Sequence, residues 1–132
     1  MRILFVCLFF IGYLTAKGQY DNSEKTILNL LASNMEHKKK IDSANFIIEN
    51  NFKQNYLFYD SIAHAVLKIS ETNVYKFGEA SAMLNIASID EGTGKLNRAE
   101  QSISKAIVYF KAMADSKTQV ALAKSYLVLG DI

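Results

Sequence analysis

The chain lacks proline altogether, and it has few glycines, two histidines and a single cysteine, Cys7. Alanine, leucine, isoleucine and lysine are abundant instead, so the composition favours helices throughout and predicts an all-α fold class. Because Cys7 lies in an N-terminal apolar run that we expect to be removed, the remaining chain would use neither disulfides nor thiol chemistry.

Residues 1–18 have the pattern of a secretory signal peptide. Arg2 supplies a short basic start, residues 3–14 form an almost unbroken apolar run, and small residues stand at Ala16 and Gly18. We therefore expect export, with cleavage after Gly18 and a periplasmic or extracellular mature chain. The apolar run has about a dozen residues, whereas a membrane span needs about 20, so a permanent transmembrane anchor is the less favoured alternative.

The charge balance changes when the leader is removed. Two of the 15 basic residues, Arg2 and Lys17, lie in the leader, so 13 basic residues remain against 13 acidic ones. The mature chain then carries no formal net charge. Nucleic-acid binding requires a basic surface or stripe, so we do not expect a nucleic-acid partner.

Apolar residues recur at helical spacing along the rest of the chain. The first expected helix, over residues 24–34, has Ser23 as its N-cap. Glycines at 92 and 94 are expected to end a later helix, because glycine readily takes the left-handed conformation of a C-terminal cap. No alternation long enough for a strand appears. The further helices are expected over residues 36–49, 57–71, 77–90, 97–114 and 118–132.

Residues 78–132 contain two copies of one ordered pattern. A turn begins at Gly94, and the small residues Ala99 and Ala106 follow at a spacing of seven, which lets one helix lie close against its neighbour. The preceding helix has three characteristic positions, and the next helix repeats them 43 residues later, from Ala87 to Gly130. The residues concerned are Met83, Ile86 and Ala87 in the first copy, and Tyr126, Leu129 and Gly130 in the second, where Ala123 precedes them and fits the pattern as well. The pattern resembles the tetratricopeptide repeat (TPR) family, in a bacterial subclass with extended repeats.

This resemblance implies antiparallel helix pairs stacked as a short α-solenoid, truncated in its last repeat. Residues 77–132 would form the TPR-like repeats and residues 19–76 a degenerate N-terminal helical region. When a period of about 40 residues is projected backwards, Tyr59 and Val66 take the alanine positions. An ordinary irregular helical bundle is the alternative.

On the same resemblance, we expect a protein–protein interaction scaffold that is not an enzyme and needs no cofactor or metal. The family binds its partners in a concave groove lined by the first helix of each pair. We therefore expect Ser81, Asn85 and Ser88 to face a protein or peptide ligand.

The chain stops at Ile132, inside the first helix of a repeat, so Tyr126, Leu127 and Leu129 are expected to lack a covering helix. We expect either a truncated chain or a partner that supplies the missing face, with self-association through the last helix as one route. A leader followed by extended repeats also resembles the extracytoplasmic sensory segment of a histidine kinase or transcriptional regulator. In that alternative, a missing downstream span would attach the chain to the membrane.

Two short motifs resemble catalytic or phosphate-binding ones. Gly94-Lys95 lacks the earlier glycine of a phosphate-binding loop, and Leu96 stands where that loop has serine or threonine. Ser102 and Lys105 fit Ser-x-x-Lys, but the partner motifs of that enzyme class are absent. We expect a turn at the first motif, and two side chains one helical turn apart on a solvated face at the second.

The histidines and the aromatic residues are expected to be structural. His37 opens the run 37–40, which is expected to be a solvated helix face. His64 follows Asp60 by four residues, so a local pair is possible, but one histidine and one carboxylate do not make a metal site. The densest aromatic group is expected to pack between helices, with a binding patch on the concave face as the alternative. Its members are Phe52, Tyr56, Phe58 and Tyr59.

The leader gives a first testable prediction. When the full chain is expressed in a bacterium, we expect the secreted protein to begin at Gln19, as read by intact mass and N-terminal sequencing. Lysine in place of Ala16 should block this cleavage, because the peptidase requires a small residue there. A membrane-bound product that keeps Met1 would instead favour the anchor.

Overall fold

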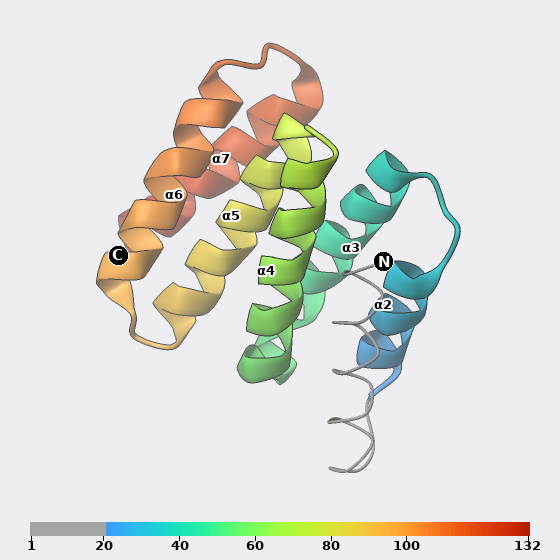
Figure 1. The fold of residues 1–132 in the computed structure, drawn as a ribbon. Coiled ribbons are helices and arrows are strands. Elements are labelled where there is room, and N and C mark those ends of the chain that lie inside the picture. Colours follow the sequence, from blue (N-terminus) through green and yellow to red (C-terminus); the bar gives the residue numbers. More distant parts are fainter. Residues whose placement is uncertain (1–20) are drawn as a thin grey trace.

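The computed structural model of the chain describes residues 21–132, which are almost entirely helical (Figure 1). No β-strand occurs in this range, so the expected all-α class is confirmed for it. None of its helices has the length and apolar character needed to cross a membrane. The leader expected over residues 1–18 lies outside the described residues. The elements are α2 (Asn22–Ala32), α3 (His37–Asn51), the 3₁₀ turn η1 (Phe52–Gln54), α4 (Tyr56–Thr72), α5 (Lys76–Gly92), α6 (Leu96–Lys111) and α7 (Ser116–Asp131).

The expected helices all occur, and their ends differ by one to three residues. The N-cap of α2 is Asp21 and not Ser23, because the Asp21 carboxylate accepts the Glu24 amide at 2.9 Å. Ser23 lies within the first turn and donates to that carboxylate. Helix α6 ends at Lys111 and not at residue 114, since the chain tightens there into short-range turns of the kind that often close a helix.

The helices form two layers. Each helix packs against the next along the chain, and α5 also contacts α3 on one side and α7 on the other, so these three lie side by side. Helices α4 and α6 cover one side of this layer (Figure 1). Helix α2 is joined to α4 by a hydrogen bond between the Ser23 and Tyr59 hydroxyls at 2.6 Å.

Helix α5 is buried on both sides. One set of its residues belongs to the core built with α2, α3 and α4, and another set belongs to the core built with α6 and α7. Several of them are alanines, whose small side chains let the neighbouring helices approach. The first set is Ala82, Ile86 and Ile89, and the second is Ala80, Leu84 and Ala87.

Gly78 sets the closest approach between α3 and α5. A Cβ atom at this position would lie 2.6 Å from Ile41 Cγ2 and 2.7 Å from Tyr75 Cδ1. Non-bonded carbon atoms prefer separations of about 3.5–4.0 Å, so a larger residue would push the two helices apart.

The helix pairs recur at regular intervals. Helices α3, α5 and α7 begin at residues 37, 76 and 116, and α4 and α6 begin at 56 and 96, so successive starts are almost equally spaced. Tyr59 and Ala99 are each the fourth residue of their helix, Val66 and Ala106 are each the eleventh, and all four are fully buried.

The 43-residue offset expected between Ala87 and Gly130 is longer than this interval. Because α5 begins at residue 76 and α7 at residue 116, the second copy of the pattern lies three residues further along its helix than the first. The pattern residues of the two helices accordingly differ in burial. In α5, Ile86 and Ala87 are buried and Met83 is half-buried, whereas in α7 Leu129 is half-buried and Tyr126 and Gly130 are exposed. Ala123 is exposed as well.

Two tight turns share one geometry although their sequences differ. In the turn from α5 to α6, Gly94 has φ +78°, and the Lys95 amide donates to the Asp90 carbonyl at 2.7 Å. In the turn from α4 to α5, Val74 has φ +51°, and the Tyr75 amide donates to the Ser70 carbonyl at 2.9 Å. Both are C-terminal caps in which one residue takes the left-handed conformation. Glycine adopts it readily, whereas a β-branched residue is strained there.

This comparison predicts the effect of exchanging the two residues. Val74 is 76% exposed, so Val74→Gly removes little packing and relieves a conformation that costs an L-residue about 1–2 kcal/mol. After the extra entropy of a glycine is subtracted, we expect a gain of about 0.5–1 kcal/mol in the free energy of unfolding, measured with urea.

The matched variant is Gly94→Val, which should lose a similar free energy. A Cβ atom at residue 94 would meet nothing within 4 Å, so the loss would report backbone conformation alone. Destabilisation by Val74→Gly would contradict the strain assigned to this turn.

Candidate functional site

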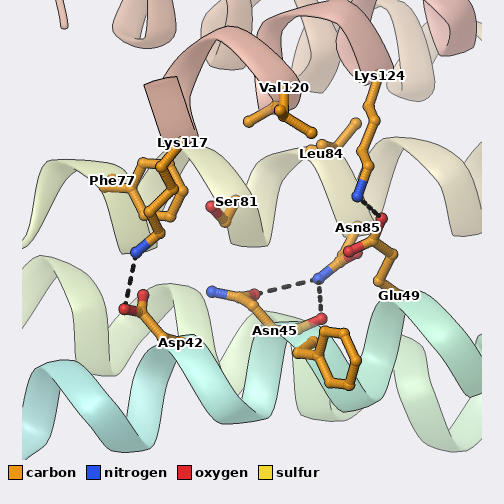
Figure 2. Close-up of a pocket in the computed structure, with 12 residues that line it drawn as sticks. Asp42, Asn45, Glu49, Phe77, Ser81, Leu84, Asn85, Lys117, Val120 and Lys124 are labelled. Atoms are coloured by element: carbon orange, nitrogen blue, oxygen red, sulfur yellow. Dashed lines mark hydrogen bonds and ion pairs between the residues drawn. The ribbon is translucent and has the colours of Figure 1, made fainter. Parts of the chain in front are cut away.

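A groove lies between α3 and α7, with α5 as its floor (Figure 2). It encloses a cavity of about 370 Å³, within the range of about 300–1,000 Å³ that is typical of ligand sites. The lining residues of α3 and α7 share the spacing i, i+3, i+4, i+7, which places them on one face of each helix. They are Asp42, Asn45, Phe46 and Glu49 of α3, Phe77, Ser81, Leu84 and Asn85 of α5, and Lys117, Val120, Ala121 and Lys124 of α7.

Two buried asparagines form the polar part of the floor. Asn85, which is 4% exposed, donates through Nδ2 to the backbone and side-chain oxygens of Asn45, each at 3.1 Å. Asn45 donates through its own Nδ2 to the Gly78 carbonyl at 3.3 Å. Because a buried amide without a partner costs about 1–3 kcal/mol, these bonds fix the register of α3 against α5.

Two ion pairs cross the groove (Figure 2). Lys117 Nζ lies 2.9 Å from Asp42 Oδ2, and Lys124 Nζ pairs with Glu49. The partners are separated by 75 residues in both pairs, so α3 and α7 run parallel. All four side chains are between one third and about one half exposed. Such pairs contribute only about 0–1 kcal/mol each to stability.

Aromatic side chains support the first ion pair. Tyr75 Oη donates to both oxygens of Asp42, at 2.9 and 3.1 Å, and Lys117 Nζ lies 3.9 Å from the Phe77 ring centre. Burial raises the pKa of Tyr75, and the hydrogen bond to Asp42 adds to this. Burial lowers the pKa of Lys117, but its contacts with Asp42 and Tyr75 together raise that pKa above its ordinary value. The ammonium therefore stays charged at neutral pH.

The rims of the groove are apolar. Phe46 on α3 is 67% exposed and Val120 on α7 is 58% exposed, while Leu84 lies buried between them. A second hollow of about 230 Å³ continues the groove along α5 and α7. Exposed aromatic and aliphatic side chains around a concave surface are typical of sites that contact a partner.

The structure brings the three predicted binding residues to this surface. Ser81 and Asn85 line the main groove, and Ser88 lines the second hollow together with Asn85. Ser81 is half-buried. Asn85 is engaged with Asn45, and the Ser88 hydroxyl donates to the Leu84 carbonyl at 3.0 Å.

The residues of the two walls were missed by the sequence reasoning. They include Asp42, Phe46 and Glu49 on α3, and Lys117 and Lys124 on α7. In the sequence, these residues are marked only by their spacing, which is the same on both helices: 42, 45, 46 and 49 on α3, and 117, 120, 121 and 124 on α7. The shared spacing points to a site only once α3 and α7 are both known to be neighbours of α5.

One basic residue differs from expectation. Residues 37–39 are exposed, as expected of a solvated face, but Lys40 is only 8% exposed. Its ammonium donates to the Ser33 carbonyl at 2.5 Å and to the Leu31 carbonyl at 3.4 Å. Lys40 is therefore a C-terminal cap for α2, where unpaired carbonyls and the helix dipole favour a cation.

The aromatic group packs in the core, as expected. Phe58 and Tyr59 are buried edge to face with ring centroids 5.0 Å apart, and Phe52 and Tyr56 pack against the same core at 5.9 Å from each other. None of the four lines the groove between α3 and α7.

Asp90 is a fully buried carboxyl next to the turn from α5 to α6. Its exposure is 0%, Arg98 Nε lies 3.4 Å from Oδ2, and neither carboxylate oxygen accepts a hydrogen bond from the described residues. Burial raises the pKa of Asp90; the charge of Arg98 opposes this rise, and that of Asp60 adds to it.

Asp60 in turn lies near His64, as the sequence suggested, with Oδ1 3.5 Å from Nδ1. Ser102 is half-buried and Lys105 exposed on α6. Within residues 21–132, no three potential metal ligands come together.

Comparison of the chain with protein-family models, with characterised proteins and with solved structures finds no match.

The buried carboxyl gives a prediction for stability against pH. Because the pKa of Asp90 is raised in the folded chain, the folded state holds this proton more tightly than the unfolded state. The contribution of Asp90 to stability is therefore greatest at low pH, and it is lost as the pH rises from about 4 through the raised value. In urea unfolding from pH 4 to 7, we expect the wild type to lose stability relative to Asp90→Asn.

Asp131→Asn, which removes an exposed carboxylate, controls for net charge. The charged neighbours of Asp90 are Arg98, Asp60, Lys95 and His64, and a His64→Gln background separates the histidine contribution. If the difference between wild type and Asp90→Asn were independent of pH, burial of this carboxyl in the folded state would not have raised its pKa.

Proposed function

We propose that this chain is an exported scaffold of TPR-like helix pairs that binds a protein or peptide segment in the groove between α3, α5 and α7. The observation that carries the proposal is the convergence of same-face residues from three alternate helices on one cavity. The leader pattern supports export. The almost equal spacing of the helix pairs, which begin at 37, 76 and 116, supports the repeat interpretation.

The chemistry of the groove favours binding over catalysis. The 12 residues that line it include no histidine, and their only hydroxyl belongs to Ser81. The charged side chains pair with one another across the groove. Acyl transfer needs a nucleophile held by a neighbouring base, and no histidine stands beside the Ser81 hydroxyl in this set.

The apolar rims provide affinity for a partner. Covering a large apolar side chain contributes about 1.5–3 kcal/mol, so burial of Phe46 and Val120 together contributes on the order of 2–4 kcal/mol, since each is already partly covered. The polar groups of the floor and walls then orient the partner, as in other concave sites.

A peptide selection tests this proposal. Peptides from a random display library would be selected on the purified protein and then measured by fluorescence anisotropy on two variants. Ser81→Trp places an indole in the groove and should weaken selected peptides by about tenfold or more, a loss of about 1.4 kcal/mol. Ser104→Trp, on the exposed surface of α6, should bind as the wild type does.

Equal binding to both tryptophan variants would place the peptide elsewhere and contradict the proposal. Failure to enrich any peptide would contradict it as well. Far-UV circular dichroism and the thermal midpoint would establish that each variant is folded.

A further inference from the structure

In each of the two ion pairs that cross the groove, the acidic and the basic side chain differ in length. Asp42 and Glu49 are short side chains on the α3 wall, whereas Lys117 and Lys124 extend from α7 across α5 to reach them (Figure 2). Asp42 also receives two hydrogen bonds from Tyr75, so it stays in place without the lysine. Asp42 is therefore held in the wall by Tyr75, whereas Glu49 has its ion pair with Lys124. Both ammonium groups are at the ends of flexible stems, and Lys117 Nζ also lies 3.9 Å from the Phe77 ring centre.

This difference between the acidic and basic side chains determines which ligand charge the groove accepts. A segment that enters between α3 and α7 must displace the lysine head groups. An acidic segment would bring its carboxylates beside Asp42, which Tyr75 holds in place, and beside Glu49, and like charges at such distances repel. A basic segment would leave both carboxylates paired, while Lys117 and Lys124 extend into water.

The distance between the two carboxylates sets the spacing of the ligand charges. Residues 42 and 49 are seven positions apart on α3, which corresponds to about 10 Å along a helix. In an extended polyproline II segment, which has three residues per turn and rises about 3.1 Å per residue, side chains three residues apart lie on the same side and about 9 Å apart. Between these two points the ligand would meet Phe46 and Val120 on the rims and Leu84 on the floor, which are apolar.

We propose that the groove binds an extended basic peptide segment in which two lysine or arginine side chains, three residues apart and separated by apolar residues, replace Lys117 and Lys124 on Asp42 and Glu49. In the free protein, the two lysines of α7 occupy the positions of the ligand cations and compete with them. This proposal rests on the proposed function, because it specifies the ligand of the same groove.

Three labelled peptides of equal length test it by fluorescence anisotropy. One has two lysines around a pair of apolar residues, and the others have glutamates or glutamines in place of the lysines. The lysine peptide should bind most tightly. Asp42→Asn with Glu49→Gln should weaken it about three- to tenfold, the size expected of two half-exposed ion pairs.

The decisive variant is Lys117→Gln with Lys124→Gln. Because it removes the internal competitor, it should strengthen binding of the lysine peptide by about threefold, and this gain should shrink at high salt. Glu100→Gln and Lys105→Gln make matched charge changes on exposed positions of α6 and should alter binding less than about twofold.

Tighter binding of the glutamate peptide, or weaker binding of the lysine peptide to the lysine-to-glutamine variant, would overturn the proposal. If Ser81→Trp blocks that binding, the groove still binds peptides and only the charge preference is wrong. If no peptide binds, or Ser81→Trp blocks none of them, the proposed function itself is wrong.

Discussion

The burial of α5 on both sides is the constraint on which the rest of the structure depends. One face of this helix completes the core shared with α2, α3 and α4, and another completes the core shared with α6 and α7. Polar residues on such a helix must find partners inside the protein. Asn85 finds Asn45, Ser88 bonds back to the Leu84 carbonyl, and Asp90 has only the neighbouring Arg98. The floor of the groove is therefore part of the core.

The floor and the walls of the groove consequently differ in how readily their contacts can rearrange. The asparagine pair and the close contact at Gly78 hold α3 against α5, so the floor changes little without loss of stability. The walls carry half-exposed ion pairs that contribute little to stability and can exchange partners. If the groove binds a ligand as proposed, the residues that maintain the fold are separate from those that would select the ligand.

Local patterns were enough to predict the helices, because these follow from helical periodicity, whereas Ser81, Asn85 and Ser88 were chosen from the resemblance to the repeat family. The walls could not be predicted, since Asp42 and Lys117 are separated by 75 residues and meet only through the packing of three helices. The cap formed by Lys40 depends on the same kind of tertiary contact. The break between the helices expected over residues 57–71 and 77–90 includes Val74, but its left-handed conformation was not predicted, because valine carries no turn signal.

The regular interval between helix starts has a consequence for how such a chain can change in length. Helices α5 and α7 begin at residues 76 and 116, so residues 76–115 form a unit of one helix, a tight turn, a second helix and the connection to the next. Duplication of this whole unit would add one further helix beside α7 and lengthen the groove, while the junctions kept their existing sequence. An insertion within a helix that is far from a whole number of turns would rotate the faces that follow out of register, whereas duplication of the whole unit leaves each helix unchanged.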